Sequence, residues 1–219
     1  MLAEQLVGEA RARHPRGMDA RERRVLGISA GLYLLAALAI AAFVPSEREL
    51  QPLLLVGLVA GYALISRVRF EVGNWFVVPE SLVFVPLVLL APLPLVPLLV
   101  ALASVLSVMP ELLNGSWHKE RAVTCLSDCW FAIGPVLVLA WLAPGEPTLA
   151  HFGVYVAAFG AQFAFDLLWT ILRDRLVDEI PYRTIIDGFV GTFRFDAILT
   201  PIAFVITLPA ADEPLILLT

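Results

Sequence analysis

The chain has 219 residues, of which 59% are hydrophobic, and a formal net charge of −5. Its mean hydropathy of +0.84 exceeds what a soluble core of this size can bury, which argues against a soluble domain. No basic patch is left for a soluble surface, so a nucleic-acid partner is not expected. A bilayer core of about 30 Å takes roughly 20 apolar residues per helix. We therefore expect an all-α fold: a polytopic membrane helical bundle of about seven transmembrane helices plus the start of an eighth, in contact with the lipid bilayer.

The positive charges are concentrated on one side of this expected bundle. Arg48 alone falls in a loop of the opposite side, and Arg194 falls inside an apolar segment. Because Lys and Arg concentrate in cytoplasmic loops, this alternation predicts a multi-pass protein of the cytoplasmic (inner) cell membrane with a cytoplasmic N-terminus. Thirteen of the fifteen Lys and Arg residues lie before Val25 or in alternate loops: Arg11, Arg13, Arg16, Arg21, Arg23, Arg24, Arg67, Arg69, Lys119, Arg121, Arg173, Arg175 and Arg183.

A cytoplasmic N-terminal arm at residues 1–24 precedes a transmembrane helical domain at residues 25–219. Prolines crowd the third and fourth spans, and because proline breaks the helical hydrogen-bond ladder, we expect two short helices joined by a tight outward turn at 91–94. Cleavage of the first span as a signal peptide stays open as an alternative, since small residues near Ala39 and Ala41 suit a signal peptidase. The expected spans are 25–44, 52–66, 77–90, 95–109, 122–143, 149–172 and 184–208.

The last residues predict that more protein follows. After an outer turn at 210–213, residues 214–219 begin another apolar run. A chain end within a hydrophobic run makes little physical sense, so we expect the N-terminal part of a longer protein. An eighth span would return the chain to the cytoplasm, where a soluble output domain could follow.

Charged residues inside the expected spans point to function, because each costs at least ~2.5 kcal/mol to insert into a membrane. Gln162, Asp166 and Trp169 share one helical face, and Asp187 and Arg194 share another. Asp196 lies opposite that second face, beside Thr192 and Thr200. The candidate ligand-binding residues are Glu80, Asp128, Gln162, Asp166, Trp169, Asp187, Arg194 and Asp196, with Glu71 at the membrane boundary.

Two interpretations of these residues remain open. They can line a polar pocket for a small ligand or cation, or they can be interhelical hydrogen bonds and one ion pair that hold the bundle together. We favour the pocket, because packing alone seldom needs so many acids. Asp128, Asp166 and Asp196 are then expected to face the bundle interior in a shared or adjoining cavity, with Arg194 paired to an acid, most readily Asp187.

No catalytic or metal-binding pattern occurs. Cys125 and Cys129 lie four residues apart in one apolar segment, where disulfide geometry is rare and the three or four ligands of a thiolate metal site are missing. We expect buried free thiols, no metal and no cofactor. No nucleophile elbow, phosphate loop or paired-carboxylate signature occurs, so this chain is not expected to be an enzyme.

Two further patterns concern packing and the membrane interface. The tryptophans are expected mostly as interface anchors: Trp75, Trp117, Trp130, Trp141 and Trp169. Small residues recur at a spacing of four in the first two spans, Ala37 with Ala41 and Gly57 with Gly61. That spacing permits close helix packing or a homodimer.

The stretch from Arg67 to Leu99, RVRFEVGNWFVVPESLVFVPLVLLAPLPLVPLL, resembles a region of one group of bacterial proteins. These are actinobacterial membrane proteins in which an N-terminal multi-span region precedes a cytoplasmic cyclic-di-GMP signalling domain of HD-GYP or GGDEF type. Further similarities are LSDCW at 126–130 before Gly134-Pro135, AQFAFD at 161–166 and FDAILTP at 195–201. The resemblance implies eight spans with a signalling domain after the last, and it implies no particular ligand.

Two functions follow as hypotheses. The first is a membrane-embedded sensory or regulatory input module, in which a ligand or the state of the membrane shifts helix packing around Asp128, Asp166 and Asp196 and so controls a cytoplasmic signalling domain. The second is a small-molecule transport protein, such as the substrate-binding membrane subunit of a vitamin transporter. The short, proline-broken third and fourth spans and the Ala-rich first span suit the second hypothesis.

Overall fold

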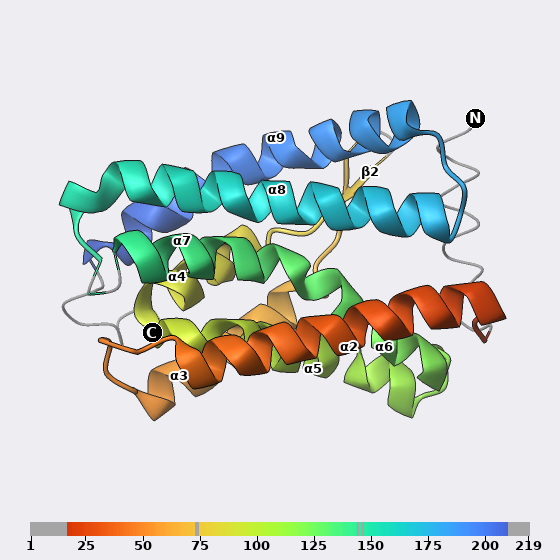
Figure 1. Ribbon diagram of the computed structural model, residues 1–219, viewed down its shortest axis with the longest axis horizontal. Helices are drawn as coiled ribbons and strands as arrows, with labels where there is room; N and C mark the ends of the chain where they lie inside the picture. Colours follow the sequence, from red (N-terminus) through yellow and green to blue (C-terminus); the bar gives the residue numbers. More distant parts are fainter. Residues whose placement is uncertain (1–16, 73–74, 144, 146, 210–219) are drawn as a thin grey trace.

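The computed structural model describes residues 17–72, 75–143, 145 and 147–209, which form a bundle of helices with one short β-hairpin (Figure 1). The elements in chain order are α2 (Ala20–Phe43), α3 (Pro52–Ile65), β1 (Phe70–Val72), β2 (Trp75–Val77), α4 (Ser81–Leu90), η1 (Leu93–Leu95), α5 (Val96–Leu113), η2 (Lys119–Arg121), α6 (Ala122–Ser127), η3 (Asp128–Ala132), α7 (Ile133–Leu142), η4 (Leu149–His151), α8 (Phe152–Leu176) and α9 (Tyr182–Thr207).

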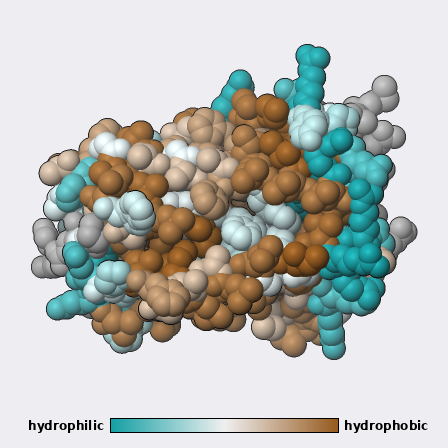
Figure 2. All heavy atoms as spheres, viewed as in Figure 1, coloured by the Kyte–Doolittle hydropathy of each residue, from teal (hydrophilic) through white to brown (hydrophobic). Residues whose placement is uncertain are grey.

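The expected polytopic membrane helical bundle is confirmed. Among the described residues, five helical segments are long and apolar enough to cross a membrane: Ala20–Phe43, Leu93–Leu113, Lys119–Leu142, Leu149–Leu176 and Tyr182–Thr207. Two further apolar helices, α3 and α4, are only about 21 Å and 15 Å long. Figure 2 shows apolar surface between two more polar ends of the molecule. Residues 210–219, where an eighth span was expected to begin, lie outside the described residues.

The first helix begins earlier than the sequence predicted. The Asp19 carboxylate accepts a hydrogen bond from the Glu22 backbone N–H at 2.7 Å and so caps α2 at Ala20. Residues 20–24, which we assigned to the N-terminal arm, are therefore the first turns of α2. The remainder of that arm, residues 1–16, lies outside the described part of the chain.

The third span was predicted wrongly at its start. Residues 77–80 are not helical: β1 and β2 form an antiparallel hairpin in which Phe70 pairs with Val77, and α4 begins only at Ser81. Pro79 disfavours helical conformation at Val78, which explains why the helix starts after it. The predicted turn at 91–94 is confirmed, since α4 ends at Leu90 and the 3₁₀ turn η1 leads into α5.

The fifth span was expected as one continuous helix, but the structure divides it. The 3₁₀ turn η3 separates α6 from α7 and begins at Asp128. Pro135 explains the break, because it has no N–H to donate to the carbonyl of Phe131, one turn earlier. A 3₁₀ stretch within a helix often marks a hinge or a functional position.

Close packing fixes α7 against α8. A Cβ placed on Gly134 of α7 would lie 2.5 Å from the carbonyl oxygen of Ala161 in α8, a distance that no side chain could occupy. On the next side, α8 contacts α9 through aromatic rings: Phe163 and Phe193 meet edge to face, with ring centroids 4.3 Å apart. The α7–α8–α9 layer therefore has fixed spacing, which places the inward faces of α8 and α9 over the centre of the bundle.

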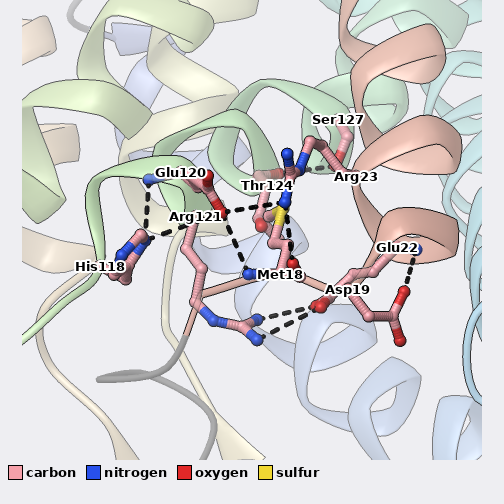
Figure 3. Close-up of polar contacts among 9 residues, drawn as sticks. All are labelled: Met18, Asp19, Glu22, Arg23, His118, Glu120, Arg121, Thr124 and Ser127. Atoms are coloured by element: carbon pink, nitrogen blue, oxygen red, sulfur yellow. Dashed lines mark hydrogen bonds and ion pairs between the residues drawn. The ribbon is translucent and has the colours of Figure 1, made fainter.

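Loops rich in Lys and Arg gather at one end of the bundle, near the start of α2, the α5–α6 connection and the end of α8 (Figure 1). We call it the arginine-rich end. Arg121 is only 8% exposed there, and its guanidinium donates to both Glu22 carboxylate oxygens, at 2.8 Å and 3.3 Å. Close by, Glu120 accepts from the Met18 backbone N–H at 3.2 Å (Figure 3). These contacts hold the start of α2 against the start of α6.

A second contact at this end joins α2 to the loop after α8. The Arg21 guanidinium donates a hydrogen bond to Glu179, and this bond, with the charge of Arg21, holds the pKa of the Glu179 carboxyl below its usual range. The start of α2 is therefore tied to two separate loops of the arginine-rich end.

Arg48 lies at the opposite end of the bundle and is buried. Its guanidinium donates to the carbonyl oxygens of Val88 at 2.6 Å, Ala91 at 3.2 Å and Gly145 at 3.0 Å. Arg48 lies in the loop where the sequence placed it, but its side chain is only 8% exposed, which the sequence did not indicate. It satisfies carbonyl groups at the end of α4 that the turn at 91–94 leaves without helical partners.

Candidate functional site

A cavity of about 380 Å³ opens between the helices, in the half of the bundle next to the arginine-rich end. Six parts of the chain wall it: the end of α3 with the residues that follow it, the β2–α4 connection with the first turn of α4, α5, the broken segment α6–η3, α8 and α9. Its polar lining residues are Tyr62, Ser66, Arg69, Glu80, Ser81, Ser104, Ser107, Cys125, Asp128, Cys129, Gln162, Asp166, Thr192 and Asp196. This volume falls within the range of small-molecule sites, roughly 300–1,000 Å³.

Four carboxyl groups from four different elements share this cavity, as the sequence predicted for three of them. Asp128, Asp166 and Asp196 all line it, and Glu80 joins them from the β2–α4 connection. The prediction that these aspartates face the bundle interior is therefore confirmed. Gln162 also lines the cavity, one turn from Asp166 on α8.

Two of the acids are held by neutral hydroxyl groups. The Tyr62 hydroxyl donates to Glu80 Oε2 at 2.7 Å, and the Ser81 hydroxyl donates to Asp196 Oδ1 at 2.6 Å. Tyr62 and Ser81 are themselves buried. Hydroxyl donors orient a carboxyl group but bring no positive charge to balance it.

Asp128 is instead held by α8. Its Oδ1 atom accepts from the Trp169 indole N–H at 2.9 Å and from Arg173 Nη1 at 3.0 Å, and Arg173 Nε also donates to Asp174 at 2.9 Å. Trp169 does not line the cavity but lies behind Asp128. Asp128 therefore connects three features: the helix break at η3, the cavity, and the arginine-rich half of α8.

The predicted pairing of Arg194 with Asp187 was wrong. Both side chains are exposed on α9, and among the described residues no ion pair joins Arg194 to an acid. The two residues do share a face, but α9 packs by the opposite face, which carries Gly188 and Asp196. The buried residues of α9 are Ile185, Gly188, Ala203 and Thr207, none of which adjoins Arg194. Neither Asp187 nor Arg194 belongs to the cavity.

The ion pair at the cavity uses Arg173, which the sequence predicted in a cytoplasmic loop. The structure continues α8 to Leu176, so Arg173 lies within the helix. The sequence contains a pattern that could have identified Arg173. Spacings of four, three and four place it on a single helical face with Gln162, Asp166 and Trp169. Tyr62 and Ser81 carry no such signal, because neither is charged and their partners are distant in sequence.

Two of the tryptophans are not simple interface anchors. Trp130 donates to the Ser29 hydroxyl at 2.8 Å and packs edge to face on Tyr33, while Trp169 is buried against Asp128. Trp141, by contrast, is 87% exposed, as an anchor in lipid would be. The side chain of Trp75 lies outside the described part of the structure, as does that of Glu71.

The two cysteines are free thiols. Cys129 Sγ donates to the Cys125 carbonyl oxygen at 2.9 Å and contacts the Ser104 hydroxyl at 3.4 Å. In the part of the chain that the structure describes, no three His, Cys, Asp or Glu side chains lie close enough together to hold a metal ion. Both thiols contribute to the polar wall of the cavity.

The charge of the cavity decides what it can bind. Four carboxyl groups line it, against the guanidinium of Arg69 at its wall and that of Arg173 bonded to Asp128. In a medium of low dielectric constant, unbalanced carboxylates strongly favour a cation nearby. The arrangement therefore suits a small molecule that carries a positive charge and several hydrogen-bond donors.

No protein-family model, no curated protein and no solved structure matches the chain.

Proposed function

We propose that this chain is a membrane-embedded sensory or regulatory input module that binds a small cationic ligand in the acidic cavity. The observation that carries the proposal is the position of Asp128. It lies at a break in a membrane-spanning segment, faces the cavity and is bonded to α8. A binding residue at a hinge is what a ligand-dependent change in helix packing requires.

The proposed switch is competition for Asp128. In the structure Arg173 occupies this carboxylate at 3.0 Å. A ligand ammonium group that pairs with Asp128 would take the place of the Arg173 guanidinium and release the end of α8. The ligand then binds more tightly to the state in which Arg173 has left Asp128 than to the state in which the two are paired. Such a difference in affinity is the only way in which binding can shift a conformational equilibrium.

The direction of signalling is part of the same proposal. The concentration of Lys and Arg at one end supports a cytoplasmic location for that end and for the N-terminus in a bacterial inner membrane. The end of α8 lies at this arginine-rich end, so a shift of Arg173 would move α8 on the cytoplasmic side. The resemblance to membrane regions of cyclic-di-GMP signalling proteins supports a cytoplasmic signalling domain as the receiver of that shift.

Transport of a small molecule is the second candidate, and one observation favours it. The cavity is lined by residues of discontinuous helices, the broken segment α6–η3–α7 and the short α4. Transporters commonly place substrates beside such breaks. Uptake of labelled putrescine into liposomes that contain the purified chain would support transport. Binding without uptake would support the sensory module.

Binding is tested by thermal unfolding of the purified chain in detergent with three small organic amines: putrescine, choline and ethanolamine. A ligand at 100 times its Kd stabilises the folded state by about 2.7 kcal/mol, so at least one amine should raise the melting temperature in a saturable way. Asp166→Asn should remove this rise. Asp187→Asn, which changes an exposed acid on α9, should keep it.

If none of the amines changes the melting temperature, or if Asp166→Asn and Asp187→Asn respond to amines alike, the cavity does not select cations. Asp166 suits this comparison because it lines the cavity without a hydrogen bond or ion pair to another described side chain, so its replacement by Asn leaves the surrounding contacts unchanged.

A further inference from the structure

A second cavity lies apart from the acidic one, in the outer surface of the bundle. It is an apolar groove of about 380 Å³ between α2 and α8. Ile28 and Leu32 form one wall, Leu168 and Leu172 form the other, and the indole rings of Trp130 and Trp169 line it as well. We call it the tryptophan groove. Its leucine and isoleucine walls are more than 40% exposed, so the groove opens to the surroundings of the bundle.

The length and place of the tryptophan groove match one leaflet of a bilayer. Along α8 it extends from Phe165 to Leu176, which is about 16 Å at the rise of an α-helix. Half of a hydrocarbon core of about 30 Å is about 15 Å. In Figure 1, the end of α8 and the start of α2 lie at the same end of the bundle, and the groove reaches Val25 of α2 and Leu176 of α8, so it occupies the half next to the arginine-rich end.

A cation lies at the end of the groove where a lipid headgroup would be. Arg24 is exposed and lies one helical turn before Ile28 on the same face of α2. Its neighbours are engaged elsewhere, Arg21 with Glu179 and Arg23 with Glu120. No ion pair of Arg24 occurs within the described part of the chain. An arginine at the level of the lipid headgroups favours anionic over zwitterionic lipids.

We propose that the tryptophan groove binds one acyl chain of an anionic phospholipid from the leaflet at the arginine-rich end, with the lipid phosphate beside Arg24. This site is distinct from the proposed ligand cavity and goes beyond it. Trp169 links the two, because it lines the groove and donates to Asp128 at the cavity wall. Lipid in the groove therefore holds Trp169 in the position that bonds Asp128.

Native mass spectrometry of the purified full chain tests the site, with phosphatidylglycerol and phosphatidylcholine of identical acyl chains added in turn. One arginine near an anionic lipid is worth ~1 kcal/mol, so phosphatidylglycerol should bind about fivefold more tightly. Arg24→Gln should bring its affinity to that of phosphatidylcholine. Leu172→Trp, which fills the groove, should weaken both lipids, whereas Leu38→Trp, on an exposed part of α2 outside the groove, should change neither.

Three results would overturn the proposal. Equal binding of the two lipids to the unmodified chain, with no effect of Arg24→Gln, would remove the headgroup contact. Equal behaviour of Leu172→Trp and Leu38→Trp would mean that lipids only coat the surface. A two-chain species that Leu172→Trp dissociates would show that a second copy of the chain, rather than lipid, covers the groove. Each of these results leaves the amine test of the acidic cavity unaffected.

Discussion

Arg173 Nη1 donates to Asp128 Oδ1 at 3.0 Å, and this pair joins the arginine-rich half of α8 to the point at which the helix α6–η3–α7 is broken. The same oxygen accepts from Trp169, one turn earlier on α8, at 2.9 Å. One carboxylate oxygen at the cavity wall therefore holds α8 through two side chains. Whatever takes this carboxylate away from Arg173 loosens α8.

A double-mutant cycle measures that pair. Asp128→Asn, Arg173→Gln and the double variant should show a coupling energy of about 1–2 kcal/mol in reversible unfolding in mixed detergent, within the range found for contacting charged residues. Values of 3–5 kcal/mol belong to fully buried pairs, whereas these side chains are 31% and 39% exposed. A coupling energy near zero would mean that the pair does not stabilise the packing of α8.

Arg48→Ala should destabilise the protein more than Arg194→Ala, although the sequence predicted an acidic partner for Arg194 and none for Arg48. Arg48→Ala leaves the carbonyl groups of Val88 and Ala91 without this donor, and an unsatisfied buried polar group costs about 1–3 kcal/mol. Arg194→Ala removes an exposed side chain and should change stability by only about 0.5 kcal/mol. Melting temperatures in detergent compare them. A larger drop for Arg194→Ala would contradict the structure.

The wrong prediction for Arg194 shows which structural features the sequence patterns could and could not predict. Positive charge and hydropathy located the helices well, since the spans predicted at 149–172 and 184–208 correspond to α8 and α9. Helical spacing also grouped Asp187 with Arg194 correctly. It could not tell which face of α9 is packed, because an apolar helix in a membrane carries apolar residues on both faces. In the structure the packed face of α9 carries Ile185, Gly188 and Ala203.

The residues of the acidic cavity, by contrast, could be predicted in part. Charged residues within apolar runs are expensive in lipid, so Asp128, Asp166 and Asp196 were expected to face inward, and they do. The partners that hold them were not predictable. Ser81 reaches Asp196 across 115 positions of sequence, and a serine in an apolar run carries no comparable penalty that would mark it.

Gly134 should be essential for the contact between α7 and α8. In Gly134→Ala the new methyl group would meet the Ala161 carbonyl at 2.5 Å, and overpacking of this kind costs typically 1–3 kcal/mol. The matched control is Gly160→Ala on α8, where nothing lies within 4 Å of the added Cβ. That variant should be neutral or more stable by about 0.5–1 kcal/mol. If thermal unfolding showed the same loss of stability for Gly134→Ala and Gly160→Ala, the close contact between α7 and α8 would not lie at Gly134.

The orientation in the membrane can be tested by labelling single cysteines with an impermeant reagent in a background that lacks Cys125 and Cys129. Ser46 and Ser116 are both exposed, and they lie at opposite ends of the bundle. A cytoplasmic arginine-rich end predicts labelling of Ser46→Cys in intact cells and of Ser116→Cys only after permeabilisation. The reverse pattern would invert the proposed orientation and place the end of α8 outside the cell.

The most direct test of the account is native mass spectrometry of the purified chain with added putrescine, for the unmodified protein, Asp166→Asn and Asp187→Asn. The acidic cavity predicts one bound putrescine per chain in the unmodified protein and in Asp187→Asn. Asp166→Asn should lose it at the same concentration, because one of the four carboxyl groups that favour a cation is gone. Equal occupancy in all three proteins, or none in any, would contradict a cation site in this cavity.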